Sequence, residues 1–121
     1  FGQANHFRRY AKDKIEYAVE RYTNEANRLT HVLDKQLAQT KFVAGREYTI
    51  ADMAIFPWMR NAESRGIDMN EYPNAKRWFD AIHARPAVQR ALQVLSNESS
   101  SNPVDDKARE VMFGKTQFQK R

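Results

Sequence analysis

Apolar residues recur at intervals of three and four positions from Asp13 to about Thr40. They are Ile15, Ala18, Val19, Tyr22, Ala26, Leu29, Leu33 and Leu37. Side chains at this spacing share one face of an α-helix, because the helix has ~3.6 residues per turn. The opposite face is mostly polar and charged. The pattern therefore predicts one amphipathic helix of about seven turns that places its apolar face in a core.

A helix start signal follows the β-branched and glycine-containing segment 42–48. The hydroxyl of Thr49 can accept a hydrogen bond from the amide of Asp52, and the Asp52 carboxylate can accept one from the amide of Thr49. We therefore predict that Thr49 and Asp52 are structural N-cap residues rather than catalytic ones. Tyr48 and Met53 stand where a hydrophobic staple would form.

The helix that Thr49 starts is apolar on nearly every side, and it carries Ala54, Ile55, Phe56, Trp58 and Met59. A helix that is apolar all round is typical of the buried centre of a bundle. We expect Pro57 to bend it, because proline removes one backbone hydrogen bond. Trp58 is interpreted as a core anchor.

Two prolines mark two further helices. Pro73 suits the first position of a helix that carries Trp78, Phe79 and Ile82 on one face, and Trp78 is interpreted as a second core anchor. Pro86 ends that helix and suits the start of a shorter one that uses Val88, Ala91, Leu92 and Leu95. The fold class predicted from these four helices is all-α, a helical bundle.

The two ends of the chain lack this periodicity. Residues 1–12 are interpreted as a loop or as the end of a helix whose start is missing, and Phe1 in place of Met suggests an excised piece. Residues 96–106 are polar and predict a flexible connection. The tail still carries apolar residues, so we expect part of it to pack on something, with a missing domain as the candidate; they are Ala108, Val111, Met112, Phe113 and Phe118. The predicted division is 1–95 for the helical domain and 96–121 for the connection and tail.

Composition excludes several kinds of chemistry. The chain has no cysteine, and its three histidines are far apart and outside any HExxH pair, so no metal site is expected. No P-loop, GxGxxG or GxSxG motif occurs. No apolar run approaches the ~20 residues that cross a bilayer, and no signal peptide is evident, so we expect a cytoplasmic protein without a membrane partner.

The net charge of +5 suits an anionic small molecule, a nucleic acid or an acidic protein surface. A solvated basic surface explains the same charge. Nucleic-acid binding is disfavoured, because most aromatic residues fall at core spacing instead of alternating with basic residues along one stripe.

Three stretches resemble the C-terminal domain of glutathione transferases: KIEYAVERY, FVAGREYTIADMAIFPW and YPNAKRWFDAIHARPAVQRAL. Their shared landmarks are Gly45, Thr49, Asp52, Pro57, Trp78 and Pro86, and they cover roughly residues 13–95. NHF followed by AVERY is most similar to the bacterial nu-class group. The resemblance implies the helical bundle of the glutathione transferase C-terminal domain.

Resemblance to the nu-class group implies a homodimer with glutathione or glutathione disulfide as cosubstrate, and disulfide reductase activity more than conjugation. It also implies a thioredoxin-like domain, missing here, that holds the catalytic residues. We therefore expect no catalytic residue in this fragment and no activity of the fragment alone. Its contributions would be a wall for the second substrate, a dimer surface and one glutathione contact.

The glutathione contact carried over by position is Arg21, in the AVERY segment. A guanidinium can bind a carboxylate of glutathione through two hydrogen bonds. The alternative is a solvated helix arginine paired with Glu25 at the i,i+4 spacing. His6, Phe7 and Tyr17 are candidates to line the mouth of the site, and ordinary packing or surface roles are the alternative for them.

Two functions remain open from the sequence. One is the helical domain of a glutathione-dependent enzyme. The other is a noncatalytic protein-association module with the same fold, since a fold alone does not settle function.

Overall fold

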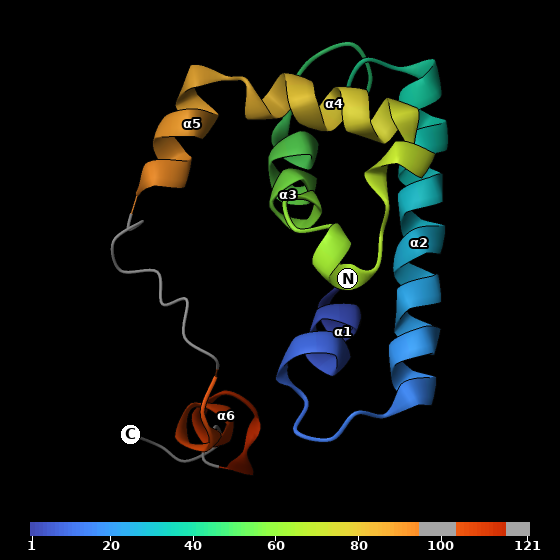
Figure 1. Cartoon of the computed structure of the whole chain (residues 1–121). Helices are drawn as coiled ribbons and strands as arrows, with labels where there is room; N and C mark the ends of the chain where they lie inside the picture. Colours follow the sequence, from blue (N-terminus) through green and yellow to red (C-terminus); the bar gives the residue numbers. More distant parts are fainter. Residues whose placement is uncertain (95–103, 116–121) are drawn as a thin grey trace.

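The computed structural model describes residues 1–94 and 104–115 (Figure 1). Within these ranges the chain is helical and contains no strand, so the all-α prediction is confirmed. The α-helices are α1 (Gly2–Asn5), α2 (Glu16–Gln39), α3 (Ile50–Met59), α4 (Pro73–His83), α5 (Pro86–Gln93) and α6 (Asp106–Phe113). A π-helical turn, η1 (His6–Tyr10), follows α1, and two 3-10 turns, η2 (Glu63–Arg65) and η3 (Met69–Glu71), lie between α3 and α4.

The long helix α2 confirms the first periodic segment with small differences. Its buried residues are Ala18, Ala26, Thr30, Leu33 and Leu37. Thr30 breaks the apolar pattern, and its hydroxyl is satisfied by donating to the carbonyl of Ala26 at 2.8 Å. Ile15, which we expected on the core face, is 50% exposed, because it is the extended residue just before the first helical turn.

Helices α2 and α4 cap each other where they cross, near the C-terminal end of α2 (Figure 1). The carboxylate of Asp34 on α2 accepts hydrogen bonds from the amides of Asn74 and Ala75 at 2.8 and 2.9 Å, so it satisfies the free N-terminus of α4. In return, Arg77 of α4 donates to the carbonyl of Leu37 at 2.7 Å. A side chain of each helix therefore satisfies backbone groups at one end of the other helix.

The predicted capping box at the start of α3 is confirmed, and its carboxylate does more than the sequence indicated. Asp52 is fully buried and accepts from the amide of Thr49 at 2.9 Å and from the amide of Val43 at 3.0 Å. It also accepts from the indole of Trp78 at 2.8 Å. Burial alone would raise the pKa of Asp52, but these hydrogen bonds outweigh it and hold the pKa below its usual value. Asp52 thus ties α3 and the preceding segment to α4.

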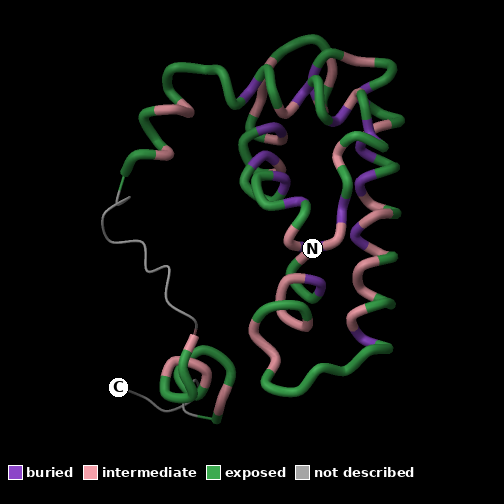
Figure 2. Tube along the Cα trace, in the orientation of Figure 1, coloured by how far each residue is buried: buried purple, intermediate pink, exposed green. Residues whose placement is uncertain are grey.

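Helix α3 is not buried on all sides, and that expectation is wrong. Ile50, Met53 and Trp58 are 82%, 52% and 46% exposed, and we call these three residues the outer face of α3. Figure 2 shows exposed and buried stretches alternating along this helix. Trp78 is a core anchor at 0% exposed, but Trp58 is not, because only one side of α3 faces the bundle. Helix α3 continues through Pro57, which lies inside its bounds.

Trp58 instead lies beside a buried cation. The guanidinium of Arg65 is 5.8 Å from the centre of the indole ring, and its Nη1 donates to the carbonyl of Trp58 at 2.7 Å. Arg65 is 6% exposed, and its pKa is lowered mainly by burial and further by the positive charge of Arg9.

Tyr48, the first member of the predicted staple, packs edge-to-face on Phe42, and its contact with Met53 stays a prediction.

The two ends of the described chain meet. Residues 2–10 are helical, which agrees with the interpretation of this segment as the end of a helix. The ring of Phe113 on α6 lies 4.7 Å from that of His6 and 5.7 Å from that of Tyr10, and Arg109 donates to the carbonyl of Tyr10 at 3.1 Å. The described part of the tail therefore packs on this chain and needs no missing domain for that contact. Leu95 and Phe118 lie outside the described residues.

Candidate functional site

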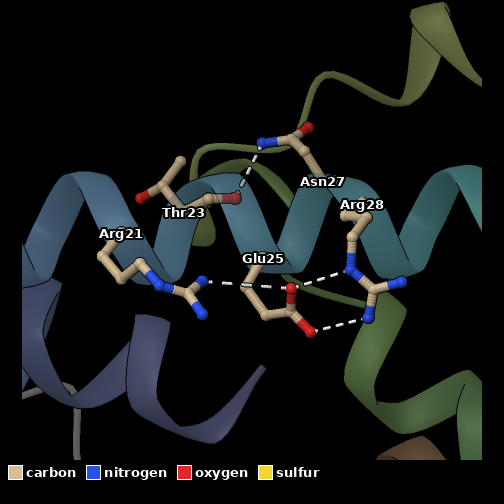
Figure 3. Close-up of polar contacts among 5 residues, drawn as sticks. All are labelled: Arg21, Thr23, Glu25, Asn27 and Arg28. Carbon is tan, nitrogen blue, oxygen red and sulfur yellow. Dashed lines mark hydrogen bonds and ion pairs between the residues drawn. The ribbon is translucent and has the colours of Figure 1, made fainter.

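Arg21 lies on α2, and its side chain is 56% exposed (Figure 3). Its Nη1 is 4.0 Å from Oε2 of Glu25, so the i,i+4 pairing that the sequence offered as an alternative is present. That distance is too long for a hydrogen bond. The contact is a loose ion pair, and it leaves the guanidinium largely available.

Glu25 is held more tightly by a second arginine, one turn further along α2. Nε and Nη2 of Arg28 donate to Oε2 and Oε1 of Glu25, each at 2.8 Å (Figure 3). The hydrogen bonds from Arg28 lower the pKa of Glu25 against the opposing effect of partial burial, and the positive charges of Arg28 and Arg21 lower it further. Glu25 is therefore a carboxylate whose two oxygens are already occupied. We call Arg21, Glu25 and Arg28 the arginine cluster.

The opposite face of α2 is anchored to the bundle by Asn27. Its Nδ2 donates to the carbonyl of Thr23 and to the carbonyl of Gly66, both at 3.1 Å. The hydroxyl of Tyr72 donates to Oδ1 of Asn27 at 3.0 Å. Figure 3 shows Thr23 and Asn27 pointing away from the arginine cluster. These bonds fix the rotation of α2 about its axis, and so they fix the direction in which Arg21 points.

Gly66 allows η1, α2 and η2 to approach one another. Its φ is +78°, and a Cβ placed on it would lie 2.8 Å from Cγ2 of Thr23 and 3.0 Å from Nη1 of Arg8. Arg8 in turn donates to the carbonyl of Ser64 at 3.1 Å and to the hydroxyl of Thr23 at 3.3 Å. The left-handed backbone and the lack of space both require glycine at position 66.

His6 and Phe7 lie together in η1, among other aromatic rings. The ring of His6 meets those of Phe7 and Phe113 edge-to-face at 5.0 and 4.7 Å, and Phe7 stacks on Tyr22 of α2 at 5.4 Å. His6, Phe7, Tyr10 and Phe113 line a hollow of about 530 Å³ between η1 and α6. Charged residues also line it: Lys12, Asp13, Asp106, Arg109 and Glu110.

The predicted site residues therefore fall on two surfaces. Tyr17 is 77% exposed, and neither it nor Arg21 lines the hollow that His6 and Phe7 share with α6. Tyr10 and Phe113 were not predicted as lining residues. The apolar character of the tail indicated that Phe113 packs on another part of the protein. Nothing in the sequence indicated that this part would be η1. The roles of Arg21, His6, Phe7 and Tyr17 toward a ligand stay predictions.

The arginine cluster and the hollow offer recognition rather than a nucleophile. Exposed guanidinium groups can bind carboxylates, and the rings can contact an apolar group. In the described part of the chain, no three histidine, aspartate or glutamate side chains gather closely enough to hold a metal ion. Over the same residues, no helix has the length and apolar character to cross a bilayer.

Residues 5–86 match the family model described as glutathione S-transferase, C-terminal domain. The chain is 53% identical over 96 residues to the Escherichia coli disulfide-bond oxidoreductase YghU and 43% identical over 91 residues to the disulfide-bond oxidoreductase YfcG of the same organism. These alignments cover 74% and 75% of this chain but only 33% and 42% of the two relatives. The chain thus spans less than half the length of either.

A solved structure shows the same fold. The glutathione transferase YghU from Streptococcus pneumoniae, in complex with glutathione, superposes with a TM-score of 0.71 at 40% sequence identity. The superposition covers 77% of this chain and 39% of that one. The capped α3, the α2–α4 crossing and the matched residues 5–86 lead to one assignment. The chain belongs to the glutathione S-transferase family and has the fold of its C-terminal domain.

Proposed function

We propose that this chain is the helical half of a glutathione-dependent transferase or disulfide-bond reductase, and that Arg21 binds a carboxylate of glutathione. The observation that carries the proposal is the state of Arg21, whose side chain is 56% exposed and lies 4.0 Å from the carboxylate of Glu25. The disulfide-bond oxidoreductases among the relatives and the glutathione-bound neighbour support the ligand class.

Arg21 can gain hydrogen bonds from a ligand carboxylate. Its contact with Glu25 is longer than a hydrogen bond, so a ligand carboxylate that approaches the guanidinium can form two shorter, charge-assisted bonds. Hydrogen bonds to charged groups contribute about 1.5–3 kcal/mol each where they are shielded from water. Arg21 therefore has binding capacity that its own helix leaves unused.

His6, Phe7 and Tyr17 form part of the wall for the second substrate in this proposal. The aromatic hollow between η1 and α6 supports that role for His6 and Phe7. The exposed ring of Tyr17, one helical turn before Arg21, supports the same role for Tyr17 toward a substrate group that extends along α2.

The remainder of the proposed enzyme lies outside this chain. A thioredoxin-like domain would hold the glutathione thiolate with hydroxyl and amide donors, and disulfide exchange would proceed by attack of that thiolate on sulfur. No catalytic residue is assigned to this chain. A homodimer, membership of the nu-class group and a cytoplasmic location belong to the same proposal and rest on the resemblance to the relatives.

A noncatalytic association module is the second candidate, and the outer face of α3 favours it. Ile50, Met53 and Trp58 expose large apolar side chains on one helix. Contiguous exposed apolar surface is typical of a protein–protein contact. A partner that covers this face without any glutathione dependence would support the association module.

Calorimetric titration of glutathione disulfide into the full-length protein tests the proposal. We expect Arg21→Ala to weaken binding by roughly tenfold or more, since a lost charge-assisted bond is worth at least ~1.5 kcal/mol. Arg90→Ala is the matched control, because Arg90 is an exposed arginine on α5 and its loss changes the net charge equally. Equal effects of the two substitutions would remove the role of Arg21. No binding by the unaltered protein would favour the association module.

A further inference from the structure

Two arginines of the cluster compete for one carboxylate. Oε2 of Glu25 is 2.8 Å from Nε of Arg28 and 4.0 Å from Nη1 of Arg21 (Figure 3). Resting on the proposed function of Arg21, we propose that Arg28 is a positioning residue, which occupies both oxygens of Glu25 and so keeps Arg21 free for a ligand carboxylate.

The spacing along α2 makes the competition direct. Arg21 precedes Glu25 by four residues and Arg28 follows it by three, and both separations bring side chains together on one face of a helix. Arg28 binds in the two-bond geometry, with its second bond at 2.8 Å from Nη2 to Oε1. That geometry orients the carboxylate toward the C-terminal side and leaves only the long contact to Arg21.

Loss of Arg28 would reverse this arrangement. Glu25 would then keep Arg21 as its basic neighbour on α2, and the i,i+4 pair could shorten from 4.0 Å to hydrogen-bond distance. A ligand carboxylate would have to displace Glu25 from Arg21 and would also meet its negative charge. Arg28 can therefore affect affinity without touching the ligand.

The expected size of this effect is modest, because the cluster is open to solvent. The side chains of Arg21, Glu25 and Arg28 are 56%, 33% and 60% exposed. Ion pairs at such positions are weak, and breaking one changes an equilibrium constant by about two- to fivefold. Calorimetry resolves a change of that size.

A double-mutant cycle in the full-length protein tests the proposal, with the dissociation constant for glutathione disulfide as the readout. We expect Arg28→Ala to weaken binding by about two- to fivefold. Glu25→Gln should tighten binding, because it removes the competing charge. Arg28→Ala on the Glu25→Gln background should add no further loss, because no carboxylate is left to be held.

The cycle also separates positioning from simple attraction between charges. If Arg28→Ala weakens binding equally in both backgrounds, Arg28 acts only as a nearby positive charge and the proposal is wrong. Arg28→Lys keeps that charge but not the two-bond geometry, so positioning by Arg28 predicts an intermediate loss of affinity. An affinity equal to that of the unaltered protein would contradict the proposal.

Failure of this inference is distinguishable from failure of the proposed function. If Arg21→Ala weakens binding and Arg28→Ala does not, Arg21 keeps its role and only the positioning by Arg28 is lost. If neither substitution changes the dissociation constant, the proposed contact of Arg21 with glutathione is itself contradicted. The pKa of Glu25 measured by NMR supplies an independent readout, and it should rise in Arg28→Ala whatever the ligand does.

Discussion

Replacing Asp52 by alanine removes a buried carboxylate that accepts four hydrogen bonds from three residues. Two come from the amide and hydroxyl of Thr49, at 2.9 and 3.2 Å, and belong to the cap of α3. The others come from the amide of Val43 at 3.0 Å and the indole of Trp78 at 2.8 Å. The substitution therefore affects α3, the segment before it and α4 at once.

The expected loss of stability can be built from these contacts. Loss of an N-cap costs about 0.5–2 kcal/mol. A buried donor left without an acceptor costs about 1–3 kcal/mol, and this applies fully to the Trp78 indole and in part to the Val43 amide, which is half-buried. We expect Asp52→Ala to lower the free energy of unfolding by about 3–5 kcal/mol, a large part of the ~5–15 kcal/mol typical of a domain.

Urea unfolding followed by tryptophan fluorescence measures this loss. Asp68→Ala is the matched control, because Asp68 also accepts from a backbone amide, that of Asn70 at 2.9 Å, but is exposed. We expect the control to lose less than about 1 kcal/mol. If both substitutions lower the free energy of unfolding equally, the buried contacts of Asp52 do not stabilise the bundle and the reasoning is refuted.

Two further predictions concern acid and Gly66. Because the pKa of Asp52 lies below its usual value in the folded chain, its contribution to stability is complete above the unfolded pKa of about 3.9 and is lost as the pH falls through the folded pKa. The urea midpoint should therefore fall more steeply below about pH 4 in the unaltered chain than in Asp52→Asn, and parallel curves would contradict this. Gly66→Ala should lower the free energy of unfolding by about 2 kcal/mol or more, because a Cβ there would lie too close to Thr23 and because the left-handed backbone at this position is unfavourable for alanine. Gly2→Ala is its control, since nothing lies within 4 Å of a Cβ at that position, and a similar loss in both would exclude the steric explanation.

The parts of the fold that depend on neighbouring residues were predictable from the sequence. The periodicity of α2 and the three-residue spacing of Thr49 and Asp52 act within one or two helical turns. The bonds from Trp78 to Asp52 and from Asn74 to Asp34 join residues 26 and 40 positions apart. Such pairs depend on how the helices cross, which periodicity does not encode.

Burial and side-chain pairing were harder to predict for the same reason. The apolar composition of α3 indicated a buried helix, but it did not show that its outer face would be about half or more exposed to solvent in the described chain. At the candidate site, the spacing predicted the pair of Arg21 and Glu25. It did not predict that Arg28, at an equally allowed spacing, binds the carboxylate more closely.

The mutual capping of α2 and α4 bears on how the molecule opens in solution. Unfolding of the C-terminal end of α2 breaks the hydrogen bond that Asp34 accepts from the amide of Asn74 at the start of α4. Unfolding of α4 breaks the bond that Arg77 donates to the carbonyl of Leu37 on α2. Their backbone amides should therefore exchange with deuterated solvent together, at the slowest rate in the chain. Helices α5 and α6 bury no side chain, so their amides should exchange through separate local openings while α2 and α4 stay paired.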